Sequence, residues 1–284
     1  MKLLITGGSG FLGQRAVRYF ETLGWKVLAP YHSQLDITEE SALREWFRNN
    51  TPEAVIHTAA ISDTGLCQRE PELSERINVD SSVSMAKICR EYGAKLVFCS
   101  SDQVYSGSTV PGPHQENEVL CPGNVYGSQK LRAEQRCLDI LPETVCLRLS
   151  WMYARNDLPE QHRHFFTELK SLLADESRIL TLPVYDRRGL TNVDTVIENL
   201  PAVLMLPGGV WNFGSENDRS TYDTVRNVLE ELGSESALRR LMPNEDAFAD
   251  NPRDITMELS KLKSAGILFP TTGEGMRLAL DQKE

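Results

Sequence analysis

The stretch "ITGGSGFLG", residues 5–13, constrains the fold of this chain more than any other part of the sequence. It begins inside a compact apolar run, "KLLIT", and leads into a segment that carries Leu12, Ala16, Val17 and Phe20 at helical spacing. A glycine-rich turn between a strand and a helix is typical of the first βαβ unit of a parallel sheet that binds a dinucleotide.

The glycines of this loop fit two spacings of the dinucleotide pattern. Gly7, Gly10 and Gly13 fit GxxGxxG, and Gly8 with the last two fits GxGxxG. Such a loop needs residues without a Cβ atom, because the backbone must turn tightly and approach a pyrophosphate closely. The N-terminus of the following helix then offers N–H groups and a partial positive charge. A tight turn without a ligand is the alternative, which the strand–loop–helix context disfavours.

The first half of the chain alternates short apolar runs with helical patterns. This alternation predicts an α/β fold, a doubly wound parallel sheet (Rossmann) with helices on both faces, followed by a smaller C-terminal α/β substrate lobe. We expect a dinucleotide-binding domain from residues 1–150 plus about 190–215, and a substrate-binding lobe from about 151–189 and 216–284. Ligands of such sheets bind at the carboxyl ends of the strands.

Composition excludes several classes of partner. The chain has 284 residues and a net charge of −10, which disfavours nucleic acid and anionic membrane surfaces as partners. No apolar run reaches the roughly 18 residues that a membrane span needs. The six cysteines show no metal-ligand spacing, and His162 and His164 lie two apart, so we predict no metal site and a cytoplasmic protein with reduced thiols.

The identity of the dinucleotide depends on the end of the second strand. That strand ends "APYHS" without the acidic residue that NAD-binding sheets often place there, and Asp36 lies beyond it, about 20 residues after the glycines. His32 and Ser33 could instead contact a 2′-phosphate. We therefore expect NADP, with NAD as the alternative, while His32 could equally be an ordinary surface residue.

A tyrosine and a lysine stand four residues apart in "NVYGSQK". On a helix this spacing places Tyr126 and Lys130 on one face. A free tyrosine has a pKa of about 10, and a nearby ammonium group would lower that pKa toward the range that acid–base catalysis requires. In isolation such a pair is more often a solvated surface pair, but this one opens the helix after a polar strand end.

That strand end is "FCSSDQVYSG". Ser101 would lie at the carboxyl end of its strand across from Tyr126, where its hydroxyl could orient a substrate carbonyl during proton transfer. A polar cap of the strand by Ser100, Ser101 and Asp102 is the alternative interpretation.

Together these stretches resemble the extended short-chain dehydrogenases/reductases, and more narrowly the dTDP-4-dehydrorhamnose reductase branch. The matching stretches occur in the family's order over residues 1 to about 155: "ITGGSGFLG", "LDIT", "VIHTAA", "INVD", "FCSSDQVYSG", "GNVYGSQKLRAE" and "RLSWMYA". The resemblance implies an NADP-dependent reductase acting on a 4-keto nucleotide-sugar, with catalysis by Ser101, Tyr126 and Lys130.

The resemblance also implies roles for further positions. Lys130 would hold the nicotinamide ribose, and the substrate side would include Asp102, Trp151 and Arg188. The remaining cofactor contacts would come from Gly7, Gly10 and Gly13 at the pyrophosphate, the backbone of Phe11 and Leu12, Asp36 and Ile37 at the adenine, and Ala59 and Ala60 beneath the phosphates and ribose.

Several departures from the branch leave the particular nucleotide-sugar open. Phe11 stands where the branch often has Gln, Gln103 replaces the usual Tyr, and the late "RPxNSxLD" pattern is "NPRDITMEL" here. An epimerase or dehydratase is an alternative that Gln103 after Asp102 disfavours, because a dehydratase usually has Glu there. A cofactor-binding regulatory subunit, like the β subunit of methionine adenosyltransferase, is another. The oligomeric state is also open, with a homodimer as one alternative.

Overall fold

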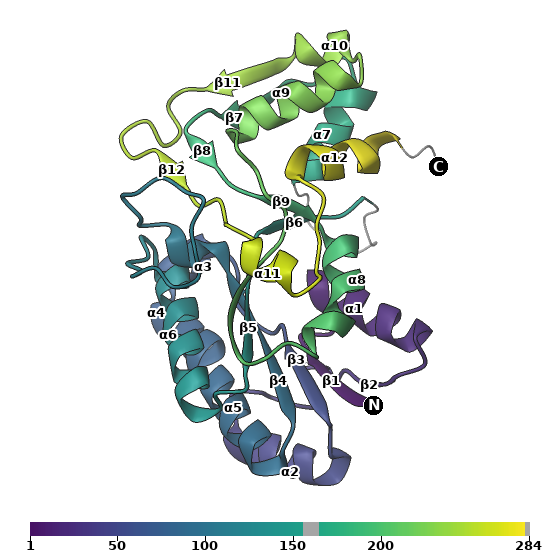
Figure 1. The fold of residues 1–284 in the computed structure, drawn as a ribbon, viewed down its shortest axis with the longest axis vertical. Helices are drawn as coiled ribbons and strands as arrows, with labels where there is room; N and C mark the ends of the chain where they lie inside the picture. The colour runs from purple at the N-terminus through teal and green to yellow at the C-terminus, as the bar shows by residue number, and fades with distance from the viewer. Residues whose placement is uncertain (156–164, 282–284) are drawn as a thin grey trace. The chain divides into compact units, whose positions relative to one another are not determined.

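The computed structural model describes residues 1–155 and 165–281, which form two compact units (Figure 1). The first unit comprises Met1–Gly107, Val119–Leu149 and Ile197–Trp211. The second comprises the described residues of Ser108–Glu118, Ser150–Val196 and Asn212–Glu284. Each unit is therefore assembled from segments that are far apart in the sequence.

A six-stranded sheet forms the centre of the first unit. Its order is β10 (Gly209–Phe213), β5 (Val145–Leu149), β4 (Lys95–Ser101), β3 (Ala54–His57), β1 (Lys2–Thr6) and β2 (Lys26–Leu28). The pairs β1–β2, β1–β3, β3–β4 and β4–β5 are parallel. The strand order reverses direction at β1, and the predicted doubly wound parallel sheet is confirmed.

Helices of the first unit cover both faces of this sheet. They are α1 (Phe11–Thr22), α2 (Glu40–Asn50), α3 (Thr64–Arg69), α4 (Pro71–Glu75), the π-helix η1 (Arg76–Asp80), α5 (Ser81–Tyr92), the 3₁₀ helix η2 (Asp102–Tyr105) and α6 (Val125–Ile140). In Figure 1, α5 and α6 lie on one side of the strands and α1 lies on the other. Helix α8 (Val193–Val203) runs from the second unit into the first.

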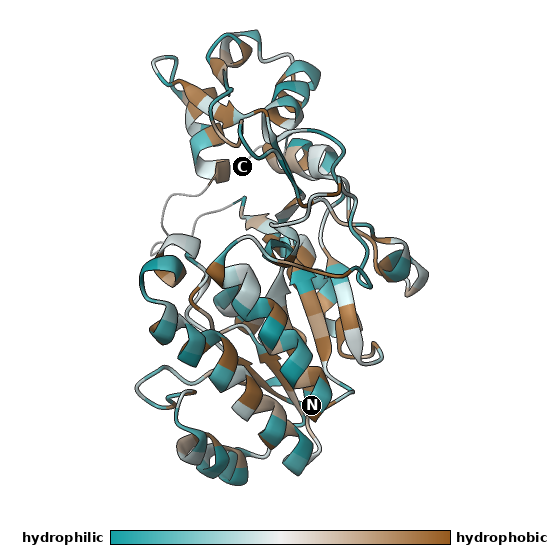
Figure 2. Ribbon diagram, turned by 90° about the vertical axis from the view of Figure 1, so that its left-hand side faces the viewer, coloured by the Kyte–Doolittle hydropathy of each residue, from teal (hydrophilic) through white to brown (hydrophobic). Residues whose placement is uncertain are grey.

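The sheet forms because its strands are apolar on both faces. Leu3, Leu4 and Ile5 of β1 are fully buried, as expected for a strand between two helical layers. Leu43 and Phe47 of α2 belong to the hydrophobic cluster that covers one face of the sheet. Figure 2 shows the strands mostly in hydrophobic colours and the outer sides of the helices in hydrophilic ones.

The second unit has no large sheet. Its elements are β6 (Trp151–Tyr153), α7 (Phe165–Ala174), β7 (Leu180–Pro183), β8 (Asp186–Arg187), β9 (Leu190–Asn192), α9 (Thr221–Glu231), α10 (Glu235–Leu238), β11 (Leu241–Asn244), β12 (Arg253–Asp254), α11 (Ser260–Ser264) and α12 (Thr272–Asp281). The strands form three parallel pairs, β6–β9, β7–β11 and β8–β12. Tyr153 stacks on Phe166 in its core, with ring centres 4.6 Å apart.

Within the described ranges, none of the helices combines the length and the apolar character that crossing a membrane requires. His162 and His164 lie outside the described residues.

Candidate active site

The glycine loop joins β1 to α1 by a close approach of two backbone segments. A Cβ atom added to Gly13 would lie 2.1 Å from the carbonyl oxygen of Gly7. Gly7 has a φ of +67°, in the left-handed region that favours glycine. The N–H of Gly10 donates to the same carbonyl at 2.8 Å. The loop therefore depends on glycine at positions 7 and 13 for its shape.

This loop fits the pyrophosphate of a dinucleotide. Gly10 is exposed and is the N-cap of α1, where it offers no side-chain acceptor to the first N–H groups of the helix. The first turn of α1 contains no acidic residue. Since a helix N-terminus favours an anion, and a Cβ at these glycines would narrow the loop, the residues present suit a phosphate group. The Leu12 side chain itself is buried.

The region predicted to contact the adenosine is partly accessible. The Asp36 carboxylate accepts hydrogen bonds from the Thr38 N–H at 2.9 Å and hydroxyl at 2.7 Å. These two hydrogen bonds hold the pKa of Asp36 below its usual value. The His32 side chain is 82% exposed and lies 3.8 Å from Asp36, and Ser33 is also exposed. The hydrogen bonds from Thr38 therefore favour the ionised form of Asp36 and tie its side chain to the turn that contains Thr38.

The end of β3 is tied to the end of β1. The hydroxyl of Thr58 donates to the carbonyl of Thr6 at 2.7 Å, and the N–H of Ala59 donates to the Thr6 hydroxyl at 3.4 Å. His57 lies 2.7 Å from that hydroxyl through Nδ1. A Cβ at Gly7 would meet the Ala59 nitrogen at 2.8 Å, so the glycine loop and residues 58–60 are neighbours. Ala59 and Ala60 are half-buried there, and Ile37 packs on the core below.

The structure brings Ser101, Tyr126 and Lys130 together. Ser101 is the last residue of β4 and precedes η2. The N–H of Gln103 in η2 donates to the Ser101 hydroxyl at 3.2 Å. Tyr126 lies in the first turn of α6, and the Ser101 side chain acts to lower the pKa of its phenol. The Lys130 ammonium lies 5.8 Å from the centre of the Tyr126 ring. All three side chains are more than nine-tenths buried.

The expectation of a lowered tyrosine pKa is wrong for this arrangement. Burial raises the pKa of Tyr126 above its usual value, the Asp102 carboxylate raises it further, and the Ser101 side chain opposes both. The Lys130 ammonium donates to the carbonyl of Cys99 at 2.8 Å rather than to the phenol. Desolvation of the phenolate therefore outweighs the attraction of the nearby ammonium, and Tyr126 is a neutral phenol at neutral pH.

Lys130 is itself perturbed by burial. Burial lowers the pKa of Lys130 to about 8, since a desolvated ammonium is disfavoured. Glu134, one helical turn later, acts in the opposite direction. The ammonium also lies 4.8 Å from the centre of the Phe98 ring, a cation–π contact. Lys130 is therefore cationic at neutral pH and loses its charge just above it.

Asp102 is almost fully buried beside this group. Its carboxylate accepts a hydrogen bond from the Ser101 hydroxyl at 3.1 Å. Behind it, Ser100, Tyr105, Glu134 and Arg148 form a buried polar network, described below, that sequence reasoning missed.

A second feature that sequence reasoning missed is the π-helical segment η1. It lies between α4 and α5, and Asn78 of η1 donates to the carbonyl of Ile61 at 3.0 Å and to the side chain of Gln129 at 2.9 Å. Gln129 precedes Lys130 on α6, so η1 contacts the helix that carries the tyrosine and the lysine. Such π-helical turns are frequent at functional sites, and "INVD" was the signal available in the sequence.

Two predicted substrate residues lie in the second unit. The Arg188 guanidinium lies 4.9 Å from the centre of the Trp151 ring. Arg188 is buried, whereas Trp151 is 41% exposed. The cation–π contact therefore covers part of the indole, and the exposed part remains open to contact a ligand.

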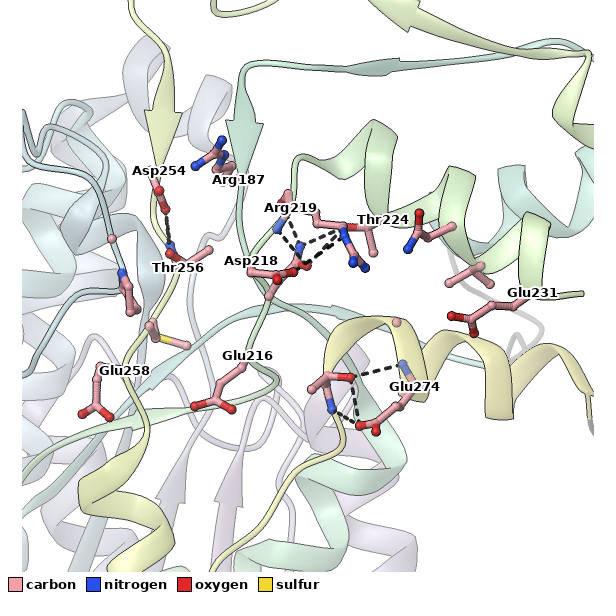
Figure 3. A pocket seen from close by; sticks show the side chains of 18 residues that line it. Arg187, Glu216, Asp218, Arg219, Thr224, Glu231, Asp254, Thr256, Glu258 and Glu274 are labelled. Carbon is pink, nitrogen blue, oxygen red and sulfur yellow. Dashed lines mark hydrogen bonds and ion pairs between the residues drawn. The ribbon is translucent and has the colours of Figure 1, made fainter.

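The second unit also contains a cavity of about 650 Å³ (Figure 3). Arg187 and Arg219 supply its two guanidinium groups, and its six carboxylates come from Glu216, Asp218, Glu231, Asp254, Glu258 and Glu274. Several of these carboxylates already have partners, as Glu216 has in Lys263 at 2.7 Å. Arg188 is not among the lining residues, although its neighbour Arg187 is.

No cluster of three or more His, Cys, Asp or Glu side chains with a metal-binding arrangement occurs in the ranges 1–155 and 165–281. All six cysteines are in these ranges and are free thiols, with Cys121 exposed and the others buried.

Comparison with known proteins finds relatives that match most of this chain. The dTDP-4-dehydrorhamnose reductase of Streptomyces griseus is 27% identical over 276 residues, which cover 93% of this chain and 88% of that protein. The methionine adenosyltransferase 2 subunit beta of Pongo abelii is 24% identical over 280 residues, covering 94% and 83%.

Solved structures share the fold. The dTDP-4-dehydrorhamnose reductase of Bacillus anthracis, solved in complex with NADP, superposes with a TM-score of 0.84 at 21% identity, covering 98% of this chain and 97% of that one. The UDP-glucose 4-epimerase of Thermotoga maritima reaches a TM-score of 0.80 at 20% identity, with 99% and 98% covered. The model of one family, described as the RmlD substrate binding domain, matches residues 1–283. The chain therefore belongs to the RmlD substrate-binding domain family.

Proposed function

We propose that this protein is an NADP-dependent oxidoreductase that reduces a 4-keto nucleotide-sugar, in line with relatives named dTDP-4-dehydrorhamnose reductase and dTDP-4-keto-6-deoxy-D-glucose reductase. One observation carries the proposal: Ser101, Tyr126 and Lys130 meet at the carboxyl end of β4, in the same unit as a glycine loop that fits a pyrophosphate. An enzyme of this class needs a proton donor beside a dinucleotide, and this unit supplies both.

In this proposal the chain positions the keto oxygen and protonates it. When bound, the reduced nicotinamide supplies the hydride. The Ser101 hydroxyl, which donates to Asp102 in this structure, would turn its proton to the keto oxygen, and Tyr126 donates its phenolic proton to the same atom as negative charge develops there. The raised pKa of Tyr126 keeps that proton in place at neutral pH. The cationic Lys130 stabilises the phenolate that forms.

The glycine loop and the end of β2 would select the cofactor. Gly7, Gly10 and Gly13 with the first N–H groups of α1 would hold the pyrophosphate. The end of β2 carries no carboxylate, and Asp36 is engaged by Thr38, which favours NADP over NAD. Asp102, Trp151 and Arg188 as substrate contacts, a cytoplasmic location and a homodimer stay predictions.

A direct assay tests the proposal. Purified protein is mixed with NADPH and a dTDP-4-keto-6-deoxy-sugar, and the loss of absorbance of the reduced nicotinamide is followed. We expect consumption of NADPH that requires the sugar and is slower with NADH. Tight NADPH binding without consumption over a panel of 4-keto nucleotide-sugars would contradict the enzymatic proposal.

The same absence of turnover would favour a second function. Because a relative covering 94% of this chain is named methionine adenosyltransferase 2 subunit beta, a regulatory subunit that binds a dinucleotide is the alternative. Co-purification of the tagged protein with a catalytic partner, together with NADP binding, would support it.

The pH dependence of reduction follows from Lys130. Since its pKa is about 8, the ammonium is present below that pH and is lost above it. Tyr126 stays protonated throughout, because its pKa is raised. We expect kcat to be constant near neutral pH and to fall as pH rises through about 8. A profile of kcat from pH 6 to 10 checks this, and a flat profile would remove Lys130 from the mechanism.

A further inference from the structure

A buried polar network lies directly behind the residues proposed for catalysis. The Ser100 hydroxyl donates to the Glu134 carboxylate at 2.5 Å. Arg148 donates to the same carboxylate through Nη2 at 2.8 Å and to the Tyr105 hydroxyl through Nη1 at 2.8 Å. None of these four side chains is more than 3% exposed. We call Ser100, Tyr105, Glu134 and Arg148 the Glu134 network.

The Glu134 network connects every element that carries a proposed catalytic group. Ser100 precedes Ser101 on β4, and Tyr105 closes η2 just after it. Glu134 lies on α6 at one turn from Lys130 and two turns from Tyr126, on the same face of that helix. Arg148 of β5 is the direct ladder partner of Ser100. Hydrogen bonds to one carboxylate therefore join α6 to β4 and β5.

We propose that Glu134 is a positioning residue of the active site, which holds α6 in register with β4 and supplies the buried negative charge that keeps the Lys130 ammonium charged. The effects on kcat expected from this inference rest on the proposed function. A bidentate contact with Arg148 fixes the orientation of the carboxylate, and the hydrogen bond from Ser100 ties it to the strand. Small displacements matter here, because misplacing reacting groups by about 1 Å can slow a reaction about 100-fold.

The other ionisable groups around Lys130 do not supply such a charge. Cys99 on β4, Cys137 on α6 and Cys67 on α3 are thiols whose pKa values burial raises, so they are neutral at neutral pH. Burial lowers the pKa of His57 on β3 to about 3, and it is neutral as well. Tyr126 on α6 is a neutral phenol. Of the groups that raise the pKa of Lys130, Cys99 comes first and Glu134 second; Glu134 is the carboxylate among them, and it is paired with Arg148 of β5 at 2.8 Å.

Three variants separate the two roles of Glu134. Glu134→Gln keeps the size of the side chain and one hydrogen-bond acceptor but removes its charge. We expect the midpoint of the alkaline fall in kcat to move about one pH unit lower, which corresponds to a tenfold change in the acid dissociation constant of Lys130. Glu134→Asp keeps the charge but is too short to reach Ser100, so kcat falls while the pH midpoint stays. Ser100→Ala loses only the hydrogen bond that joins Glu134 to β4. We expect kcat to fall about fivefold to tenfold without a shift in the pH midpoint.

A matched control is available on the same helix. Asp139 is exposed on α6, and Asp139→Asn removes a charge without entering the network. We expect this variant to keep the kcat, the NADPH affinity and the pH profile of the wild type. The unfolding midpoint of each variant is measured alongside, because removing one partner of a buried ion pair also lowers stability.

A measurement independent of turnover completes the test. The Nζ resonance of Lys130 is followed by ¹⁵N NMR against pH and is assigned by its loss in Lys130→Arg. We expect a titration near pH 8 in the wild type and a lower midpoint in Glu134→Gln. If the wild type does not turn over but the midpoint shifts, the proposed function is wrong and the charge role of Glu134 stands. If Glu134→Gln lowers only the unfolding midpoint, the network is merely structural and the inference is overturned.

Discussion

Replacing Tyr126 with Phe should abolish reduction of the keto sugar while leaving the affinity for NADPH within about twofold of the wild type. The phenol is the proposed proton donor to the keto oxygen, and general acid catalysis typically contributes about 10²–10⁴ in rate. Phe keeps the ring, which is 7% exposed, and removes one oxygen atom. Binding of the cofactor depends on the glycine loop at the end of β1, so the substitution should not disturb it.

Stopped-flow or steady-state oxidation of NADPH measures the loss of turnover, and quenching of protein fluorescence by NADPH measures cofactor affinity. Tyr92→Phe provides the control, because it makes the same change at an exposed tyrosine on α5 of the same unit. Equal kcat in Tyr126→Phe and in the wild type would show that another group protonates the product. A loss of kcat together with a tenfold loss of NADPH affinity would point instead to a collapsed site.

The parallel sheet and the positions of the catalytic candidates could be predicted from the sequence because their signals are local. A glycine loop after an apolar strand, and a tyrosine four residues before a lysine, each depend on one element. The rule that ligands bind at the carboxyl ends of parallel strands then placed Ser101 beside α6 without any knowledge of distances.

The ionisation of Tyr126 could not be predicted in the same way. The sequence shows that an ammonium lies one helical turn away, and this favours a lowered pKa. It does not show that Asp102 is buried nearby or that the Cys99 carbonyl takes the hydrogen bond of Lys130. Because burial and a carboxylate act against the ammonium, the sign of the shift depends on three-dimensional surroundings.

The Glu134 network shows a second limit of sequence reasoning. Ser100 could be interpreted only as part of a polar strand end, since its partners lie 34 and 48 positions later in the chain, at Glu134 and Arg148. The same holds for the cavity of the second unit, whose lining runs from Gly112 to Glu274. Side chains brought together from distant segments leave no periodicity or spacing that a reader of the sequence could detect.

Replacing Gly13 with Ala should abolish detectable NADPH binding and lower the free energy of unfolding. The new Cβ would lie 2.1 Å from the Gly7 carbonyl oxygen and 2.8 Å from the Gly7 carbonyl carbon, far inside van der Waals contact. These are backbone atoms at the tip of β1, so relief requires α1 to move away from the strand. Overpacking of this kind typically costs about 1–3 kcal/mol of stability.

The displacement should affect the cofactor more than the fold. The pyrophosphate would contact N–H groups at the first turn of α1, and these move with the helix, so we expect NADPH affinity to fall at least about 100-fold. Fluorescence titration with NADPH and urea unfolding measure the two effects. Gly273→Ala is the control: it lies in the first turn of α12, where an added Cβ meets nothing within 4 Å, and alanine there should leave stability unchanged or raise it by up to about 1 kcal/mol. Wild-type NADPH affinity in Gly13→Ala would mean that the loop does not hold the cofactor, since the clash cannot be relieved without moving the very groups proposed to bind it.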